Sequence, residues 1–517
     1  MPAHRADGRA ARAIAAVLAL GALVLGALAP AASAVAAVPA ETVAATKVAI
    51  VVPVIAPTRV AGLIPAEELA ELTAAGGALA KTLDAVVGER VTLAIDPLIA
   101  ASINALGADA PADAVAWARR LDQLPHERFL LLTADADPTL LRQAGEALPA
   151  LGTVWTTPGT VSPTDVEAFA AAGASRILLA DADLLDHEDE SIALAAAGGV
   201  GLRVIDTEAS AALQAAVQTP SSASLGALRQ AIAGDATRES IVVGLDRTGA
   251  GWPGLETVLD SLHSDLGLEL VGLSGLSGET VDTELAEGGQ PASRLDAYRQ
   301  LVAAEQSDSA FASIMADAED FRDERRLRSF ALAAVGWSAD PAGWTVAVDD
   351  AVEASRTLRA GVRIEESDSL FLADRSSIPI SIVNDLDRPV TVVVTARASD
   401  GRLDVDRTPV TVDIPAASRA TVSFAATAVS NGTVAVSARL SAVDGTVIGP
   451  PAIARINVQA GWETPIAAAA AGVLLLIVVI GIIRTVRRVR RARAAGAPAA
   501  TEAQGAPEAP DPGPAHE

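Results

Sequence analysis

The chain has 517 residues, 50% of them hydrophobic, so it is long enough for several domains with real cores. It contains no cysteine, which excludes disulfides, thiolate metal sites and cysteine nucleophiles. Its formal net charge of -25 makes nucleic acid and anionic lipid head groups poor partners for its surface.

The amino terminus has the pattern of an export signal. Arg5, Arg9 and Arg12 precede an apolar run from Ala13 to Leu28, and small residues of the A-x-A kind end at Ala34. This order predicts a secretory signal peptide over residues 1–34. An uncleaved first helix is the alternative, and either one places the following chain outside the cytoplasm.

Residues 46–285 alternate between apolar strand-like runs and stretches with helical spacing. The strands are expected at Lys47–Ile55, Arg90–Ile95, Arg128–Thr133, Gly152–Thr156, Arg176–Leu179, Gly201–Ile205, Ile241–Leu245 and Leu268–Leu273. Helices are expected at Ala66–Val87, Ala110–Leu124, Thr139–Leu148 and Pro163–Ala172, the last with Ser162 as N-cap. Such alternation indicates βαβ units and a parallel sheet. We expect an irregular (β/α) barrel-like domain, with an open doubly wound sheet as the alternative.

The next two segments have other patterns, so the predicted fold class is α/β plus all-β. Residues 286–360 read as a helical subdomain that includes one long helix over Phe311–Trp337. Residues 361–460 alternate by twos between turn signals, which predicts an immunoglobulin-like β-sandwich. Its strands are expected at Ile378–Asn384, Val390–Ala396, Val410–Ile414, Ala420–Ala426, Thr433–Leu440 and Ile453–Val458.

Pro465–Ile483 carries no charge and is followed at once by arginines, beginning with Arg484. As a helix with about 1.5 Å rise per residue it reaches about 28 Å, which nearly matches a hydrocarbon core of about 30 Å. We therefore predict one transmembrane helix, with a buried core helix as the alternative. Basic residues beside a span stay in the cytoplasm, so residues 484–517 form a basic, disordered cytoplasmic tail of a type I membrane protein.

The only residues with a catalytic pattern are acidic ones at strand ends. They are Asp96, Asp135, Asp137, Asp181, Asp183, Asp206 and Asp246. The carboxyl ends of parallel strands share one mouth, where Asp96, Asp135 and Asp137 are the candidate catalytic residues. The alternative is structural, because aspartate is favoured in turns and at helix N-caps.

Signatures of other chemistries are missing. The histidines show no H-x-x-x-H or H-E-x-x-H spacing, and no G-x-S-x-G elbow, P-loop or G-x-G-x-x-G is present. We therefore predict no metal site and no cofactor.

Three short motifs carry a resemblance: the VVPV strand, the AIDP strand exit ending at Pro97, and the LLTADADPTLL segment ending at Leu141. Together with the sandwich, the span and the arginines, they resemble an uncharacterised family of actinobacterial single-pass membrane proteins, a domain of unknown function. The resemblance implies a role in the cell envelope, because genes of that family often lie near the gene of the lipid II flippase. In outline the barrel also resembles NodB-type polysaccharide deacetylases. Asp96 corresponds to one of their metal-side aspartates, whereas their following aspartate and paired histidines are absent.

We therefore expect a membrane-anchored extracytoplasmic protein, a non-catalytic accessory or binding protein linked to peptidoglycan precursor handling. The expected partners are the membrane, a glycan, and an envelope-synthesis protein such as a lipid II flippase. The alternative is an envelope carbohydrate hydrolase or deacetylase that uses the strand-end aspartates. A transport or signalling subunit is a third interpretation, based on topology alone.

Overall fold

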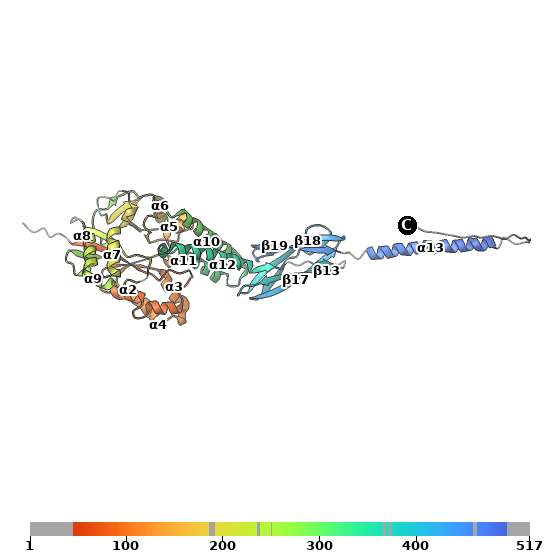
Figure 1. Cartoon of the computed structure of the whole chain (residues 1–517), viewed down its shortest axis with the longest axis horizontal. Coiled ribbons are helices and arrows are strands. Elements are labelled where there is room, and N and C mark those ends of the chain that lie inside the picture. Colours follow the sequence, from red (N-terminus) through yellow and green to blue (C-terminus); the bar gives the residue numbers. More distant parts are fainter. Residues whose placement is uncertain are drawn as a thin grey trace, which may run out of the picture. The chain divides into compact units, whose positions relative to one another are not determined.

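The computed structural model describes residues 45–60, 62–185, 192–234, 238–249, 251–365, 369–371, 375–458 and 463–493. The chain divides into two compact units, Met1–Ala45 and Thr46–Glu517, and the second holds every described element (Figure 1). The predicted signal peptide and the tail after Arg493 lie outside the described residues.

The first part of the second unit contains a largely parallel sheet. Its strands are β1 (Thr46–Val54), β2 (Thr92–Ile95), β3 (Glu127–Leu130), β4 (Thr153–Trp155), β5 (Arg176–Ala180), β6 (Leu194–Ala197), β7 (Val200–Ile205), β8 (Ser240–Gly244), β9 (Leu268–Val271) and β10 (Val281–Asp282). Parallel pairs run in the order β4-β5-β7-β8-β1-β2-β3, with β9 also paired to β1. β6 was not predicted, and it pairs antiparallel to β7.

Helices connect these strands. They are α1 (Ala66–Thr73), α2 (Ala78–Val86), α3 (Pro97–Leu106), α4 (Ala112–Gln123), α5 (Pro138–Ala144), α6 (Pro163–Ala171), α7 (Thr207–Gln218), α8 (Ser222–Ala233) and α9 (Leu255–His263). β1 shows why the strands are apolar throughout. Val48, Ile50 and Val52 pack in the core shared with the helices, whereas Ala49 and Val51 pack in a second core on the other face of the sheet.

The two ends of the strand order, β3 and β4, are not paired with each other among the described strands. β3 pairs only with β2, and β4 pairs only with β5. The parallel sheet is thus confirmed, whereas its closure into a barrel stays a prediction.

Two helix predictions in this part were incomplete. The helix expected at Ala66–Val87 is two helices, because Gly76 adopts φ +87° and Gly77 passes so close to Glu71 that a Cβ would lie 2.3 Å from its carbonyl oxygen. α3, α7, α8 and α9 were not among the helices assigned from the sequence. The Ser162 N-cap of α6 is confirmed, with the side chain of Asp165 completing a capping box.

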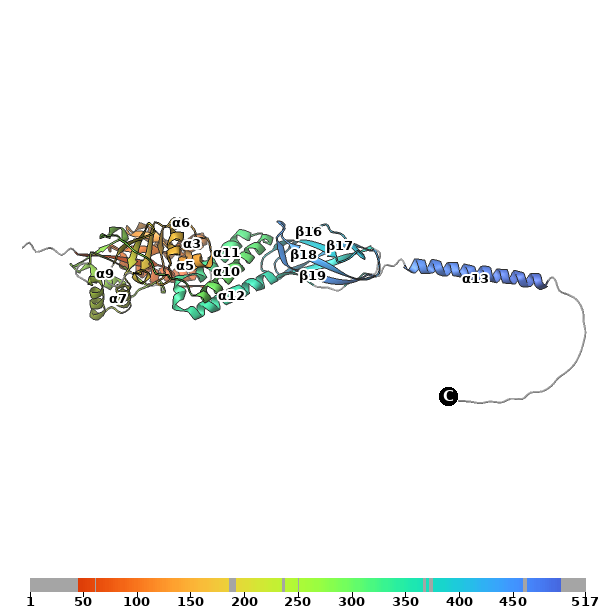
Figure 2. The same ribbon diagram turned by 90° about the horizontal axis from the view of Figure 1, so that it is seen from above.

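The next part is helical, as predicted, and Figure 2 shows its three long helices side by side. They are α10 (Ala292–Phe311), α11 (Ala318–Leu332) and α12 (Pro341–Ala360), with short 3-10 turns η5 (Ala312–Ile314) and η6 (Val335–Ala339) between them. The single helix expected at Phe311–Trp337 is therefore wrong. Met315 leaves the helical conformation with ψ 148°, and η6 replaces the last turn.

Residues 362–458 form two sheets whose strand pairs are antiparallel, except that β12 pairs parallel to β19. One has the order β11-β13-β17-β15 and the other the order β12-β19-β18-β14-β16. The strands are β11 (Val362–Ile364), β12 (Ser369–Phe371), β13 (Arg375–Asn384), β14 (Val390–Ala398), β15 (Leu403–Val405), β16 (Val410–Ile414), β17 (Ser418–Ala428), β18 (Gly432–Ser441) and β19 (Val447–Val458). Alternate residues such as Ile380, Val392 and Val436 fill one core. All six predicted strands are present, whereas the immunoglobulin-like assignment stays a prediction.

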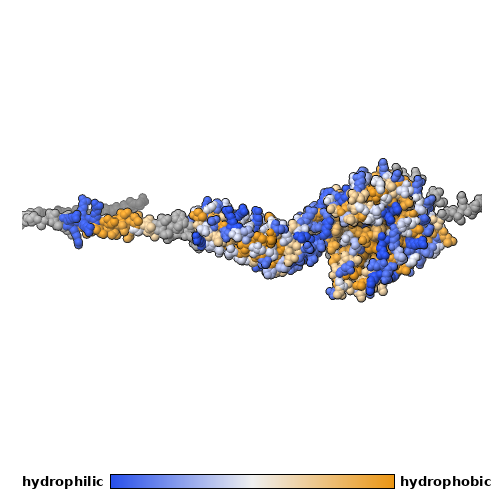
Figure 3. Space-filling view, turned by 180° about the vertical axis from the view of Figure 1, so that it is seen from behind, coloured by the Kyte–Doolittle hydropathy of each residue, from blue (hydrophilic) through white to orange (hydrophobic). Residues whose placement is uncertain are grey.

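The last element is α13 (Glu463–Arg493). Its stretch Ala467–Arg491 is long and apolar enough to cross a membrane, and none of it is buried within the protein. Figure 3 shows an apolar band on this helix followed by a hydrophilic end, where Arg484, Arg487, Arg488, Arg490 and Arg491 lie.

Candidate functional site

Asp96 lies at the carboxyl end of β2 and is 3% exposed. It is the N-cap of α3: its Oδ1 accepts a hydrogen bond of 2.9 Å from the backbone N–H of Leu98. The same oxygen accepts a second bond of 2.9 Å from the N–H of Ala134, in the loop after β3. Asp96 therefore fixes the loop that carries the next candidate residue. Burial raises the pKa of Asp96 to about 7.

Asp135 lies in that loop, and its backbone conformation is unusual. Ala134 and Asp135 have φ values of 60° and 50°, so two consecutive residues other than glycine adopt the left-handed region. Such conformations cost about 1–3 kcal/mol each and persist where the surroundings determine them. The bond from Ala134 to Asp96 is one such constraint, and it points the Asp135 carboxylate toward the interior, where it is 4% exposed.

Arg247 follows β8 and is the partner of Asp135. Its Nη1 donates to Asp135 Oδ1 at 2.7 Å, and its Nη2 donates to the carbonyl oxygen of Trp155 at 3.1 Å. The guanidinium also lies 4.6 Å from the centre of the Trp155 ring, within cation–π distance. Arg247 thus joins the carboxyl ends of β3, β4 and β8 in one buried cluster, which we call the Asp135–Arg247 pair.

The second oxygen of Asp135 is not used within the chain. Oδ2 is buried and has no hydrogen-bond partner among the described protein atoms. Burial raises the pKa of Asp135 to about 6, although the charge of Arg247 acts in the opposite direction. The orphaned oxygen is a ready acceptor for a hydrogen-bond donor that enters from outside.

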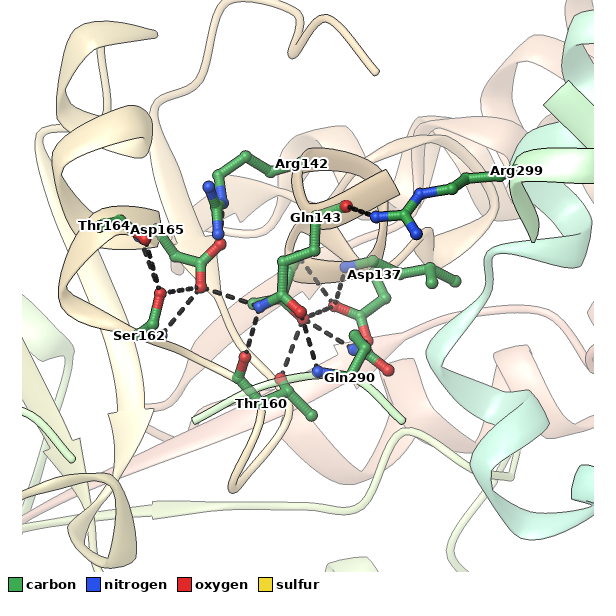
Figure 4. A network of polar contacts seen from close by, with 11 residues as sticks. Asp137, Arg142, Gln143, Thr160, Ser162, Thr164, Asp165, Gln290 and Arg299 are labelled. Atoms are coloured by element: carbon green, nitrogen blue, oxygen red, sulfur yellow. Dashed lines mark hydrogen bonds and ion pairs between the residues drawn. The ribbon is translucent and has the colours of Figure 1, made fainter. Parts of the chain in front are cut away.

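Asp137 has a different role, shown in Figure 4. Its Oδ1 accepts from the N–H and hydroxyl of Thr139 at 2.9 and 2.6 Å, as the N-cap of α5. Its Oδ2 accepts from Gln290 Nε2 at 2.7 Å and from the hydroxyl of Thr157 at 3.2 Å. Both oxygens of Asp137 are therefore engaged in bonds that hold α5 against the segment before α10.

The remaining strand-end aspartates are also engaged locally. Asp183 accepts from the N–H groups of Gly159 and Ala180, and Asp206 is the N-cap of α7 and is paired with Arg238. Asp181 accepts from Thr207, and Asp246 from Thr248. These aspartates fit the structural alternative considered for the sequence, because each one caps a helix or fixes a turn.

Three cavities adjoin the Asp135–Arg247 pair. The largest, about 530 Å³, lies between the unpaired strands and is lined by residues 128–133, 135, 136, 138, 149–155, 175 and 247; we call it the β3–β4 cleft. A second, about 190 Å³, is bordered by Trp155, Asp246 and Arg247. A third, about 20 Å³, has room for about one water molecule and touches both Asp96 and Asp135.

The helical part borders the smallest cavity. Ala331, Ala334 and Gly336 line it opposite Asp96. The approach is close at Gly336, where a Cβ would lie 2.0 Å from the hydroxyl of Thr58. The backbone N–H of Asp137 also donates to the carbonyl of Ala333 at 2.8 Å. The chain's own η6 region therefore covers Asp96 and leaves the β3–β4 cleft as the larger opening to Asp135.

Of the three predicted catalytic residues, the structure brings Asp96 and Asp135 to one cavity and gives Asp137 a separate structural role. Arg247 was not predicted. Its only sequence signal is its place, directly after the aspartate that ends a buried strand. Within the described residues no group of three acidic or histidine side chains is arranged to hold a metal ion.

Comparison with known proteins gives a family and no activity. Residues 227–511 match the model of a family of unknown function (DUF6049), so the chain belongs to that family. No curated protein matches the chain.

Several solved structures show weak similarity. The α-amylase AmyC from Thermotoga maritima is 10% identical over 60% of this chain and 92% of that one, with a TM-score of 0.38. The α-2-macroglobulin fragment from Escherichia coli is 24% identical over 19% of this chain and 16% of that one, with a TM-score of 0.17. WR4, an MSP family member from C. elegans, is 11% identical over 19% of this chain and 98% of that one, with a TM-score of 0.16. Scores this low establish neither a shared fold nor a shared function.

Proposed function

We propose that this chain is a membrane-anchored extracytoplasmic binding protein of the cell envelope, without catalysis of its own. One observation carries the proposal: Asp135 lines the β3–β4 cleft and its buried Oδ2 has no partner among the described protein atoms, while the other candidate carboxylates cap helices. A cleft of about 530 Å³ with apolar walls and few polar groups is typical of a ligand site.

The proposed topology follows from the ends of the chain. Arginines after Ile483 favour a cytoplasmic end for α13, and the export signal favours translocation of everything before it. In this arrangement the parallel sheet forms a barrel with a gap at the β3–β4 cleft. The two antiparallel sheets form an immunoglobulin-like spacer next to the membrane.

The proposed role is in peptidoglycan precursor handling, beside an envelope-synthesis protein such as a lipid II flippase. Its support is the resemblance of the VVPV, AIDP and LLTADADPTLL motifs to actinobacterial envelope proteins. The ligand on this proposal is cell-wall material, which has both glycan and peptide parts.

Co-sedimentation tests this function. Full-length protein in nanodiscs is mixed with purified bacterial cell-wall sacculi, and the pelleted fraction is measured for the wild type, Leu130→Glu and Leu266→Glu. Leu130 is 63% exposed in the cleft, whereas Leu266 is 99% exposed outside it, so the second variant is a matched control. We expect wild type and Leu266→Glu to pellet and Leu130→Glu to stay in solution. Equal behaviour of the two variants, or no pelleting of wild type, contradicts the proposal.

A second candidate is an envelope carbohydrate hydrolase or deacetylase. The observation that favours it is the raised pKa of Asp96, about 7, and of Asp135, about 6, at one cavity. An acid and a base poised near neutral pH suit general acid–base catalysis. Incubation of the same nanodiscs with sacculi, followed by assays for reducing sugars and acetate, tests it. Product release that disappears in Asp96→Asn would replace the binding proposal with this one.

A further inference from the structure

The β3–β4 cleft is bordered by two strand edges without partners. Leu131 donates its N–H to the carbonyl of Ile95, so Leu131 and Phe129 face β2 and the intervening Leu130 turns its backbone groups toward the cleft. On the other side Thr156 donates to Leu178, so Thr153 and Trp155 turn their backbone groups toward the cleft, where the Trp155 carbonyl already accepts from Arg247. Unpaired edges of this kind are templates for an additional strand.

An ion pair lies at each end of the cleft. At one end Arg176, on β5, donates to Glu127 Oε1 at the start of β3 at 2.8 Å. At the other end Arg247 binds Asp135 at 2.7 Å and the Trp155 carbonyl at 3.1 Å. The edges are therefore fixed in place without hydrogen bonds between them, and the gap is part of the fold.

The two ends of the cleft differ in charge. Asp135 presents its orphaned Oδ2 at the carboxyl end of β3, and Asp96 lies at the adjoining small cavity. Arg247 is already bound to Asp135, and Arg59 is paired with Glu68. Asp135 is the carboxylate that lines the cleft, and its Oδ2 has no partner among the described protein atoms, which favours a hydrogen-bond donor such as an ammonium group at this end.

We propose that the β3–β4 cleft binds an extended peptide as an added strand, antiparallel to β3 and β4, with its free amino terminus at Asp135. The inference rests on the proposed binding function and names the chemical class of the ligand. Backbone hydrogen bonds to both edges supply affinity, as in other cases of strand addition. At about 3.3 Å per residue the edge from Arg128 to Leu132 spans about 13 Å, which suits a peptide of about four residues.

Charge complementarity sets the direction of the peptide. A parallel orientation would bring the terminal carboxylate of the peptide toward the Asp135 carboxylate, and two like charges repel each other. The antiparallel orientation brings the ammonium to Oδ2. The walls, which include Phe129, Leu131 and Leu151, favour small apolar side chains along the strand.

The test uses full-length protein in nanodiscs and the peptide Ala-Val-Ala-Val-Lys, labelled with a fluorophore on the lysine side chain. Fluorescence anisotropy measures binding of the free-amine peptide and of its N-acetylated form. We expect acetylation to weaken binding of the wild type by at least about 10-fold, the loss of one charge-assisted hydrogen bond. In Asp135→Asn the difference between the two peptides should shrink.

Leu130→Pro and Leu130→Ala separate backbone pairing from side-chain contact. The proline removes an N–H that has no partner in the native sheet, so the protein keeps its own hydrogen bonds. Leu130→Ala should bind the peptide within about threefold of wild type. Leu130→Pro should bind it at least about 10-fold more weakly, because the hydrogen bond from the Leu130 N–H to the peptide is lost. Equal binding by the two variants overturns the proposal, and so does equal binding of the two peptides to wild type.

The peptide-binding assay and the co-sedimentation assay test the peptide ligand and the binding function separately. Failure of the peptide to bind, with sacculi still pelleted in a Leu130-dependent way, overturns the peptide ligand and retains the binding function. Failure of both measurements overturns both. If Leu130→Pro does not fold, the comparison of free and acetylated peptide on the wild type still decides the question.

Discussion

The parallel and antiparallel parts of this chain differ in whether their buried polar side-chain atoms all have hydrogen-bond partners. Among the described residues, the buried side-chain atoms that lack a hydrogen-bond partner belong to the parallel part, to Gln290 just before α10, and to Arg294 and Arg325 on helices α10 and α11; none belongs to the antiparallel sheets. In the antiparallel sheets the buried polar side chain is Asn384, whose Nδ2 donates to the carbonyls of Arg388 and Pro415 and whose Oδ1 accepts from Leu386. That asparagine is satisfied on all sides, as structural polar groups usually are.

The two parts differ in the burial of their ion pairs but not in the presence of backbone strain. Ala134 and Asp135 have positive φ values in the parallel part, and Ala417 has a φ of 48° in the antiparallel part. The ion pair of Asp135 with Arg247 is almost fully buried. The pair of Arg363 with Asp385, in the antiparallel part, is half exposed. Unsatisfied buried groups are enriched at functional sites, and this is the reason that the proposed binding site lies in the parallel part.

The largest expected effect is that of Arg247→Met. It leaves Asp135 buried without its charge partner, and breaking a buried pair costs about 3–5 kcal/mol of the free energy of unfolding. Urea unfolding of full-length protein, followed region by region by hydrogen exchange, measures it. The control is Arg363→Met, for which the loss of an exposed pair costs less than about 1 kcal/mol. Equal losses of unfolding free energy in the two variants would contradict the expected difference between the buried and the exposed ion pair.

Gly77→Ala comes next. Its Cβ would lie 2.3 Å from the main-chain carbonyl oxygen of Glu71, which cannot rotate away, so we expect destabilisation by about 1–3 kcal/mol, as in other overpacked sites. Gly401→Ala, in the antiparallel part, has no atom within 4 Å of the added Cβ and should be nearly neutral. Thermal unfolding of both variants checks the pair. A neutral Gly77→Ala would mean that the α1–α2 break tolerates more movement than its geometry implies.

Asp96 in the parallel part and two aspartates in the antiparallel part should make stability depend on pH in opposite directions. Asp96, with its pKa raised to about 7, binds a proton in the folded state that the unfolded chain, with pKa 3.8, releases. Its contribution is complete below about pH 4 and is lost as pH rises toward about 7. A loss of about 1.4 kcal/mol corresponds to one pKa unit. The pKa values of Asp406 and Asp444 are lowered by their bonds to Thr408 and Thr446, so stability there is lost as pH falls.

Asp96→Asn is the matched test of that pH dependence. Asparagine keeps the N-cap of α3 but does not titrate. Urea unfolding monitored by exchange in α3 and β3 should depend less on pH between about 4 and 7 in the variant, and the remaining dependence comes from Asp135 and Asp183, whose pKa values are raised to about 6. If the free energy of unfolding depended on pH in the variant as it does in the wild type, the titrating group would not be Asp96.

The smallest expected effect is that of Leu130→Pro on stability. The Leu130 N–H faces the β3–β4 cleft without a partner, so we expect a change below about 1 kcal/mol. Leu131→Pro is the control, because it removes the 2.9 Å bond from Leu131 to Ile95 and should destabilise clearly. Thermal unfolding distinguishes the two. A large loss in Leu130→Pro would indicate that β3 has a partner on its free side.

Sequence patterns predicted the strands better than the site. β-branched runs such as Lys47–Ile55 identify buried strands, and the shared mouth of parallel strands predicted that Asp96 and Asp135 meet. Asp137 follows the same rule in sequence, yet its contacts with Thr139 and Gln290, the latter 153 residues away, make it structural.

The missed features depend on tertiary contacts. Nothing local marks Arg247 as buried, because an arginine after a strand is ordinarily exposed. The positive φ of Ala134 comes from its bond to Asp96, 38 residues earlier. The break at Gly76 and Gly77 was visible as a glycine pair, but helical spacing on both sides outweighed it in the prediction.

Hydrogen–deuterium exchange of the full-length protein in nanodiscs, with and without solubilised cell-wall fragments, tests the central claim most directly. We predict slower exchange at Leu130, Leu132 and Thr153, which border the β3–β4 cleft, and unchanged exchange throughout β13–β19. Protection confined to the antiparallel sheets, or no protection anywhere, would contradict the assignment of binding to the parallel part.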